Sequence, residues 1–279
     1  MNKRVSGKKI AEEIKEELKE KIAFMEKKPV FSIVYVGQDK VIDNFIRYKQ
    51  KFGEAIGVEV IVHRFPQEIT EEQLIEEVFN IFSNKKNDAV IVQLPLPKHI
   101  EAQAVLDTLP VAMDVDVLGT SAKELFHSGN SPMMAPVTGA MIEILKRRNF
   151  SLTDKNIVIF GYGNLVGKPF GLWLDAQNIP YEVIDRNTDE VEKRKLLKNA
   201  ELIVSGVGVP HILKPDMISE NVVLLDGGTS EAGKKIRGDV DPACYEKALF
   251  YTPVPGGIGP LTIAILYRNV LESTKYSLE

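Results

Sequence analysis

The residues with the clearest chemical role form a glycine-rich turn in the second half of the chain. The turn residues are Gly161, Gly163, Asn164, Val166 and Gly167. In a dinucleotide-binding βαβ unit the first glycine permits the tight turn, the second lets the backbone approach the pyrophosphate, and the third allows close helix packing. The spacing here is GxGxxxG, one residue longer than the common fingerprint. The prediction therefore rests on the apolar strand pattern before the turn and the helical pattern after it.

Two charged residues end the next predicted strand, 181–186. Asp185 lies 185 − 161 = 24 residues past the first glycine, near the roughly 20 expected of an acid that binds the adenosine ribose. Its carboxylate would accept hydrogen bonds from a 2′-hydroxyl and repel a 2′-phosphate, which favours NAD, whereas Arg186 could pair with a 2′-phosphate, which favours NADP. The alternative is a solvated ion pair, and the sequence leaves the choice between NAD and NADP open.

A lysine and a glutamine indicate a second site in the first half. On the helical pattern 41–56, Lys49 borders the apolar stripe, one turn after Phe45 and beside Tyr48. A desolvated amine there would have a lowered pKa and could transfer protons, although a surface lysine at the helix edge is the alternative. Gln93 stands at the carboxyl end of a buried run, where open α/β sheets bind ligands. The alternative for Gln93 is a hydrogen-bonded amide at a strand end.

A loop near the C-terminus, TPVPGGIGPLT (252–262), contains three prolines and three glycines. So constrained a loop can offer backbone N–H groups to a ligand. No metal site is predicted, because the chain has one cysteine, Cys244, and its four histidines lack metal-ligand spacing.

The elements that must position these residues alternate along the chain, which indicates parallel βαβ units and an α/β fold. Thr70 and Gln73 form a capping box that opens one of the predicted helices. The predicted strands are 30–37, 58–65, 88–97, 156–161, 181–186, 201–206 and 221–228, followed by a pair at 235–240 and 249–254. The predicted helices are 10–25, 41–56, 71–82, about 138–148, one from about residue 167, and one at the C-terminus.

The stretch 110–137 is irregular and rich in glycine, proline, asparagine and serine, so we place a domain connection there. We expect a first domain over 1–137, a nucleotide-binding domain over 138–261, and a C-terminal segment, 262–279, that packs back on the first domain.

The composition is that of an ordinary globular protein. The chain has 279 residues, 44% of them hydrophobic and 27% charged, and its net charge is −4. This balance argues against a general nucleic-acid binder, which needs a basic surface. The polar start does not resemble a signal peptide and no run has the 18 apolar residues of a membrane span. We therefore expect a cytoplasmic protein without membrane or nucleic-acid partners.

Several motifs occur together in one order over nearly the whole chain. They are VGQDK (36–40), Lys49-Gln-Lys51 with EAIGV, VQLPLPKHI, MDVDVLG, GYGNLVGKP, GDVD and TPVPGGIGPLT. In this combination the chain resembles the bifunctional methylenetetrahydrofolate dehydrogenase/cyclohydrolase family. The resemblance implies two α/β domains that flank a cleft, with folate on the first and NAD(P) on a Rossmann-type second domain, and a homodimer.

The resemblance also implies the chemistry and the roles of residues. Hydride passes from 5,10-methylenetetrahydrofolate to the cofactor, and water then attacks the methenyl carbon to give 10-formyltetrahydrofolate. Lys49 would be the catalytic lysine, Gln93 would hydrogen-bond it, and Asp116 would bind the amino-substituted edge of the pterin. The substrate cleft would also be lined by Phe45, Tyr48, Pro253, Gly256 and Gly257.

The chain departs from the family pattern near these residues. Phe45 stands where the family has a tyrosine, and the usual KDVDG reads MDVDV, which places Met113 and Val117 around Asp116. Gly163 replaces a serine, and a CTPxG-like segment reads MAPVTG. The cyclohydrolase step depends most on the polar surroundings of the lysine. A dehydrogenase without cyclohydrolase activity, and a non-catalytic folate- or nucleotide-binding protein, are therefore the alternatives.

Overall fold

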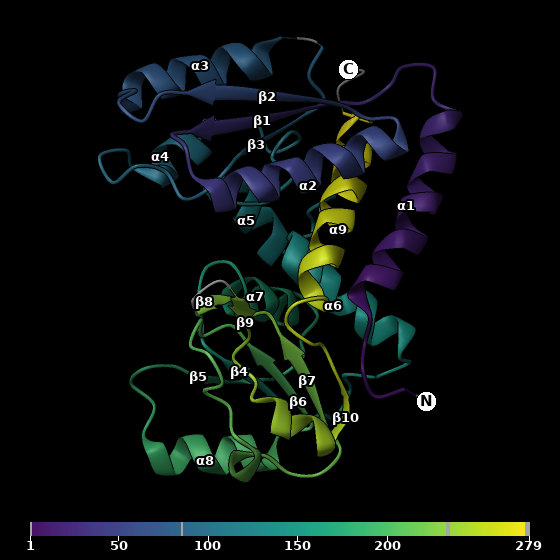
Figure 1. Ribbon diagram of the computed structural model, residues 1–279, viewed down its shortest axis with the longest axis vertical. Helices are drawn as coiled ribbons and strands as arrows, with labels where there is room; N and C mark the ends of the chain where they lie inside the picture. The colour runs from purple at the N-terminus through teal and green to yellow at the C-terminus, as the bar shows by residue number, and fades with distance from the viewer. Residues whose placement is uncertain (1, 85, 233–234, 277–279) are drawn as a thin grey trace. The chain divides into compact units, whose positions relative to one another are not determined.

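The protein folds into two compact α/β units, seen in a computed structural model. The structure describes residues 2–84, 86–232 and 235–276. One unit comprises Glu12–Pro136 and Ile263–Glu279, and the other comprises Met1–Ala11 and Val137–Thr262. Both contain a parallel sheet, as the alternation of strands and helices predicts (Figure 1).

The first unit is built on a three-stranded parallel sheet in the order β2-β1-β3. Its strands are β1 (Val30–Val36), β2 (Glu59–Phe65) and β3 (Ala89–Val92). This unit contains the helices α2 (Lys40–Ile56), α3 (Glu71–Ser83), α4 (Ala102–Leu106) and α5 (Thr120–His127). It also contains α1 (Gly7–Ala23) from Glu12 onward and α9 (Ile258–Ser273) from Ile263 onward. Figure 1 shows α3 on one side of this sheet and α2 on the other.

Alternate side chains of the central strand β1 serve the two faces of the sheet. Val34 and Val36 pack with Leu74 and Val78 of α3 in one apolar cluster. On the other face Phe31 meets the Tyr267 ring edge-on, with ring centres 5.5 Å apart. All seven residues of β1 are buried, as expected for a strand covered on both sides.

Caps define where two of these helices begin. The carboxylate of Asp39 accepts hydrogen bonds from the N–H groups of Val41 and Ile42, which starts α2. The predicted capping box between Thr70 and Gln73 is present at the start of α3. The caps therefore set the first residues of both helices.

Tyr267 of α9 fixes the position of α2. Its ring stacks on Phe52 with centres 5.2 Å apart, and its hydroxyl donates to the carbonyl oxygen of Lys49 at 2.6 Å. The approach needs Gly53, since a Cβ there would overlap the Tyr267 hydroxyl and lie 2.5 Å from a Val60 methyl group. The C-terminal segment thus sets the helix turn that carries Lys49.

The second unit is built on a five-stranded parallel sheet in the order β10-β7-β6-β4-β5. Its strands are β4 (Ile157–Phe160), β5 (Glu182–Ile184), β6 (Leu202–Ser205), β7 (Val222–Asp226) and β10 (Ala248–Tyr251). The helices are α6 (Pro136–Arg147), α7 (Gly167–Ala176) and α8 (Glu190–Asn199), with the 3-10 turns η1 (Pro215–Met217) and η2 (Pro242–Glu246). From β4 the chain moves to β5 on one side and then to β6 on the other, so the strand order reverses at β4.

The predicted pairing of 235–240 with 249–254 is wrong. The segment β9 (Lys235–Arg237) pairs antiparallel with β8 (Ser230–Ala232), whereas β10 joins the main sheet parallel to β7. Neighbouring apolar runs suggest a hairpin, but here η2 separates them and returns the chain in the direction of the parallel sheet.

The first eleven residues differ from the predicted domain assignment, which placed them in the first domain. The Val5 N–H donates to the Tyr251 carbonyl and the Tyr251 N–H donates to the Lys3 carbonyl, both at 2.9 Å. These bonds extend the edge of the five-stranded sheet beyond β10, so the N-terminal segment belongs to that unit.

The stretch 110–137, expected to be irregular, contains α5, and α4 lies just before it. Both helices are short, with five and eight residues, so their apolar pattern is brief. None of the helices in the described ranges is long and apolar enough to cross a membrane.

We expect Gly53→Ala to destabilise the first unit by about 1–3 kcal/mol, because the added methyl group must displace Tyr267 or Val60. Gly259→Ala is the matched control, since a Cβ at Gly259 meets nothing within 4 Å. Urea unfolding of both variants measures the effect. Equal stability of the two variants would show that the contact of α2 with α9 is not tight.

Candidate active site

Lys49, Gln93 and Asp116 come from three separate segments of one compact unit. Lys49 lies on α2, Gln93 directly follows β3, and Asp116 lies in the loop before α5. Val90 of β3 forms a parallel bridge with Asp114, so the chain around Asp114 runs beside β3 in the same direction. Gln93 and Asp116 therefore leave the sheet at the same edge, the carboxyl end, where α/β sheets bind ligands.

The Lys49 amine and the Gln93 amide form a direct hydrogen bond. Nζ of Lys49 donates to Oε1 of Gln93 at 2.9 Å. The other end of the amide, Nε2, donates to the Leu94 carbonyl at 2.8 Å, which leaves Oε1 directed at the lysine. Both side chains are partly buried. The structure thus brings together two residues that lie 44 positions apart in the sequence.

Burial and charge act in opposite directions on this lysine. Burial lowers the pKa of the Lys49 amine below its ordinary value, and the negative charge of Asp116 partly offsets that effect. Burial likewise raises the pKa of the Asp116 carboxyl group, and the charge of Lys49 opposes the rise. The amine and the carboxylate are therefore close enough to influence each other. An amine with a lowered pKa can release and take up a proton near neutral pH more readily than an exposed lysine.

Asp114, which the sequence analysis did not single out, shapes the loop that carries Asp116. Its Oδ2 accepts hydrogen bonds from the N–H groups of Leu118 and Gly119 at 2.9 and 2.7 Å. The loop between them includes Val117 in a left-handed conformation with φ of 57°, which is costly for a β-branched residue. Asp114 is 1% exposed, and burial raises the pKa of its carboxyl group to about 6.

Phe45 and Tyr48 lie on the same helix as Lys49 and are exposed. The exposed fractions are 45% for Phe45 and 56% for Tyr48. Large aromatic side chains usually bury more of their surface, so both are available to contact a flat ligand. The spacing of four residues puts Phe45 on the side of the helix that carries Lys49.

The glycine-rich turn follows β4 and leads into α7, as predicted. Gly161 has a φ of 92°, and a Cβ there would lie 2.8 Å from the Gly206 carbonyl oxygen. A Cβ at Gly167 would overlap the Gly161 carbonyl, so the helix packs closely on the turn. Gly163 and Asn164 are exposed, and Val166 is partly buried.

These residues fit a dinucleotide. No side chain caps the start of α7. The Lys168 N–H donates to the Gly163 carbonyl at 3.0 Å and Pro169 has no N–H, so the Gly167 N–H is the group of this first turn that can reach a phosphate oxygen. The turn also lies at β4, where the strand order reverses, and ligands of open α/β sheets bind at this position.

Asp185 and Arg186 directly follow β5 and are exposed. One oxygen of Asp185, Oδ1, accepts from the Asn187 N–H at 2.8 Å and from the Thr188 hydroxyl at 3.3 Å. This bonding stabilises the local turn and leaves Oδ2 for a ligand. The geometry is compatible with both the structural and the ribose-binding interpretation.

Pro253, Gly256 and Gly257 belong to the unit of the five-stranded sheet. Pro253 and Gly257 are buried, and a Cβ at Gly257 would lie 2.6 Å from the Pro253 carbonyl oxygen. The Gly256 carbonyl accepts from the Gly7 N–H at 3.0 Å, while a Cβ at Gly256 would meet nothing within 4 Å. Gly257 therefore serves packing, and Gly256 has open space beside it.

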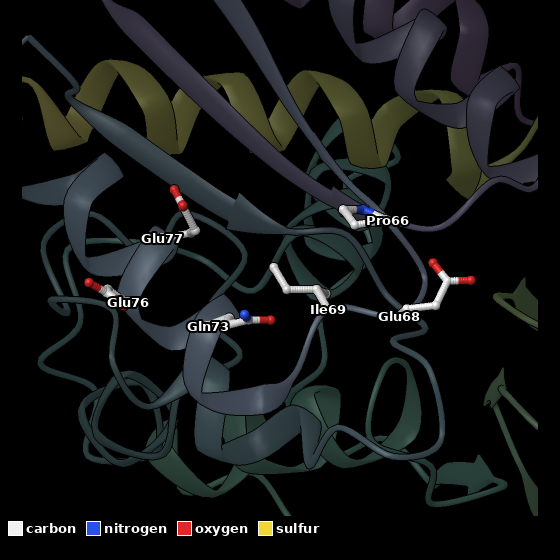
Figure 2. A pocket seen from close by; sticks show the side chains of 6 residues that line it. All are labelled: Pro66, Glu68, Ile69, Gln73, Glu76 and Glu77. Carbon is white, nitrogen blue, oxygen red and sulfur yellow. The ribbon is translucent and has the colours of Figure 1, made fainter.

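One hollow in the surface, of about 500 Å³, contains none of the predicted site residues. Figure 2 shows its lining, which comes from the turn after β2 and from α3: Pro66, Glu68, Ile69, Gln73, Glu76 and Glu77. Gln73 is already engaged in the capping box of α3. Among the described residues, no group of three or more histidine, cysteine, aspartate or glutamate side chains could hold a metal ion.

Two family models match the chain over most of its length. The model of the tetrahydrofolate dehydrogenase/cyclohydrolase catalytic domain matches residues 5–116. The model of the NAD(P)-binding domain of the same family matches residues 135–278. The match to the catalytic domain contains the three-stranded sheet, and the match to the NAD(P)-binding domain contains the five-stranded sheet.

Similar proteins cover the whole chain. The bifunctional protein FolD of Aquifex aeolicus is 34% identical over 277 residues, covering 97% of this chain and 94% of the relative. The crystal structure of the bifunctional FolD enzyme of Campylobacter jejuni has a TM-score of 0.94 and 29% identity, and each chain is covered to 98%. A Trypanosoma brucei dehydrogenase-cyclohydrolase, solved with NADP and an inhibitor, has a TM-score of 0.93 and 26% identity, covering 99% of this chain and 98% of that one. This chain belongs to the tetrahydrofolate dehydrogenase/cyclohydrolase family.

Proposed function

We propose that this protein oxidises 5,10-methylenetetrahydrofolate to the 5,10-methenyl form with NAD(P)+ and then hydrolyses that product to 10-formyltetrahydrofolate. The observation that carries the proposal is the Lys49–Gln93 hydrogen bond beside Asp116, in a chain that matches this family over most of its length. The unit around β1 would bind the folate, and the unit around β4 would bind the dinucleotide.

The hydrolytic step needs little more than positioned water and one proton carrier. The methenyl carbon is already electrophilic, so the protein has to hold water near it and accept a proton from that water as the C–O bond forms. A proton is then returned to N5 as the bond between that carbon and N5 breaks, which leaves the formyl group on N10. Lys49 suits this role because burial lowers the pKa of its amine. Gln93 fixes the position of Nζ, and its amide is held in turn by the Leu94 carbonyl.

Substrate binding would use the groups around the lysine. The Asp116 carboxylate would accept hydrogen bonds from the amino-substituted edge of the pterin, and the charge of Lys49 favours the ionised form of that carboxyl group. Phe45 would contact a flat ring through its exposed face. Lacking a hydroxyl group, Phe45 can supply area but no hydrogen bond.

The nucleotide, when bound, supplies the hydride acceptor. The Gly167 N–H at the start of α7 and the backbone around Gly161 and Gly163 would bind its phosphates. Asp185 or Arg186 would contact the adenosine ribose from the end of β5. The choice between NAD and NADP depends on which of these two neighbours makes the contact.

A dehydrogenase without cyclohydrolase activity is the second candidate, favoured by Phe45, which removes a hydroxyl group one turn from Lys49. Absorbance at the methenyl and reduced-cofactor bands after mixing with methylenetetrahydrofolate separates the candidates. Reduced cofactor with persistent methenyl product indicates the dehydrogenase alone. No reduction of either nucleotide would overturn the proposed function and indicate a binding protein.

By its family resemblance we further infer that the protein works in the cytoplasm as a homodimer. Light scattering gives the mass in solution, and a single-chain mass would contradict the dimer.

We expect Lys49→Met to reduce methenyl hydrolysis by at least about a hundredfold, since the proton carrier is lost. Nucleotide affinity should not change, because the glycine-rich turn belongs to the other unit. Lys51→Met, an exposed lysine on the same helix, is the matched control. Hydrolysis at the wild-type rate in Lys49→Met would remove Lys49 from the mechanism.

The pH profile of hydrolysis should respond to Asp116. The Asp116 charge raises the pKa of Lys49, so Asp116→Asn should lower that pKa further and shift the rising limb of kcat to lower pH. Asp43→Asn, on the same helix as Lys49 and paired with Arg64, should leave the profile in place. A shift to higher pH would contradict the assigned coupling.

Substitutions after β5 should separate the two nucleotides. If the Asp185 carboxylate binds the ribose, Asp185→Ala weakens NAD more than NADP, because only the unphosphorylated ribose offers it a 2′-hydroxyl. Arg186→Ala should have the opposite preference. Titration of each variant with both nucleotides measures the four affinities, and equal losses for NAD and NADP in Asp185→Ala would show that Asp185 is structural.

A further inference from the structure

Two buried carboxyl groups in the unit of the five-stranded sheet have no place in the proposed chemistry. Asp226 ends β7, and Asp239 lies in the GDVD motif after β9. Asp226 is 1% exposed and Asp239 is 0% exposed. Burying two acidic groups close together costs free energy of folding unless each is well hydrogen-bonded. The hydrogen bonds of these two carboxyl groups therefore indicate what they do.

Asp239 accepts hydrogen bonds from three successive backbone N–H groups. Its Oδ2 accepts from the Val207 N–H at 2.7 Å, and its Oδ1 accepts from the N–H groups of Gly208 and Val209, both at 3.0 Å. The Ser205 hydroxyl donates to Oδ2 at 2.8 Å. Consecutive N–H groups that point to one place normally bind an anion, and here the side chain of Asp239 is that anion.

The surroundings of the two carboxyl groups are shaped to hold them. A Cβ at Gly228 would overlap the Asp239 carboxyl group, and a Cβ at Gly238 would overlap that of Asp226. Each carboxyl group thus occupies space that a glycine leaves open. This is close packing around the acids rather than an accidental cavity.

Asp226 holds the backbone from which Asp239 projects. Its carboxyl group accepts from the N–H groups of Asp239 and Val240 at 3.2 and 2.9 Å, and from Gly228 at 3.0 Å. Burial, together with the charge of Asp239, raises the pKa of Asp226 to about 7. The chain therefore supports Asp239 through a second acid.

The loop that Asp239 holds lies where a dinucleotide is expected. Residues 206–209 follow β6, the strand beside β4 at which the strand order reverses. The Gly206 carbonyl oxygen would lie 2.8 Å from a Cβ at Gly161, so this loop touches the glycine-rich turn. The crevice outside the carboxyl ends of two such strands is the usual ligand position in open α/β sheets.

We propose that Asp239 is a positioning residue for the nucleotide: it holds the loop 206–209 against the glycine-rich turn and so sets the affinity for NAD(P). The residue acts through the loop and does not touch the reacting atoms. The inference rests on the proposed function, because it takes the ligand of the glycine-rich turn to be a dinucleotide.

Asp239→Asn tests this role. The amide has nearly the same shape as the carboxylate, but its NH2 group cannot accept a hydrogen bond. At least one backbone N–H group of residues 207–209 therefore loses its acceptor. An unsatisfied donor in this loop should weaken the binding of NAD(P)H about tenfold or more, measured by its fluorescence in the absence of folate. In the assay, KM for the nucleotide should rise while KM for the folate stays within about twofold, a difference that general destabilisation does not produce.

Asp241→Asn is the matched control. It changes the second aspartate of the same motif, which caps η2 through the Ala243 N–H and pairs with Lys214. Nucleotide affinity in this variant should equal that of the wild type. Equal losses in Asp239→Asn and Asp241→Asn would overturn the proposal.

Gly208→Ala tests the role of the same loop if the Asp239→Asn variant does not fold. Gly208 has a φ of 76° and open space around its Cβ position, so alanine strains the loop without disturbing the core. We expect the same selective rise of KM for the nucleotide. Wild-type affinity in Gly208→Ala would overturn the role of the loop, whereas failure of the wild type itself to bind NADH or NADPH would overturn the proposed function.

Discussion

The removal of one amine from water is the constraint on which the candidate active site depends. A partly buried lysine is stable only where acceptors replace its hydration, and Lys49 has the Gln93 amide and the nearby Asp116 charge. The turn of helix beneath it is held by Tyr267, whose hydroxyl bonds the lysine's own carbonyl oxygen. The C-terminal helix thus contributes to the site without supplying a reacting group.

Carboxyl groups have two roles in this protein, and the two groups differ in burial. Asp116 is partly exposed and its charge acts on Lys49, whereas Asp114 and Asp239 are buried and accept hydrogen bonds from backbone N–H groups. The buried acids take the position that a bound anion or a water molecule would otherwise occupy. They fix irregular loops, because a loop has no ladder of backbone hydrogen bonds to define its shape.

The sequence predicts the sheets and the glycine-rich turn well, because apolar periodicity and glycine spacing are local signals. The bond between Lys49 and Gln93 is expected only from the family resemblance, since the two residues lie 44 positions apart. It does not predict the roles of Asp114 and Asp239, since their partners are backbone N–H groups, which every residue but proline has. The direction of β10 is also not predicted, because the residues of a short apolar run do not distinguish parallel from antiparallel pairing. Likewise, nothing in the composition of residues 3–5 announces that they extend a sheet edge formed some 245 positions later.

The contact between Gly7 and the loop 253–257 joins two segments that lie about 250 positions apart in the sequence. A Cβ at Gly7 would overlap the Gly257 carbonyl, and its N–H bonds the Gly256 carbonyl oxygen. Because residues 3–5 run parallel to Tyr251, the chain before Val5 leads away from this loop and toward Glu246, whose carbonyl oxygen accepts from the Lys3 side chain. An affinity tag placed there leaves the loop undisturbed, whereas exchanging the residues around Gly7 between homologues would alter the packing of a loop encoded about 250 codons later.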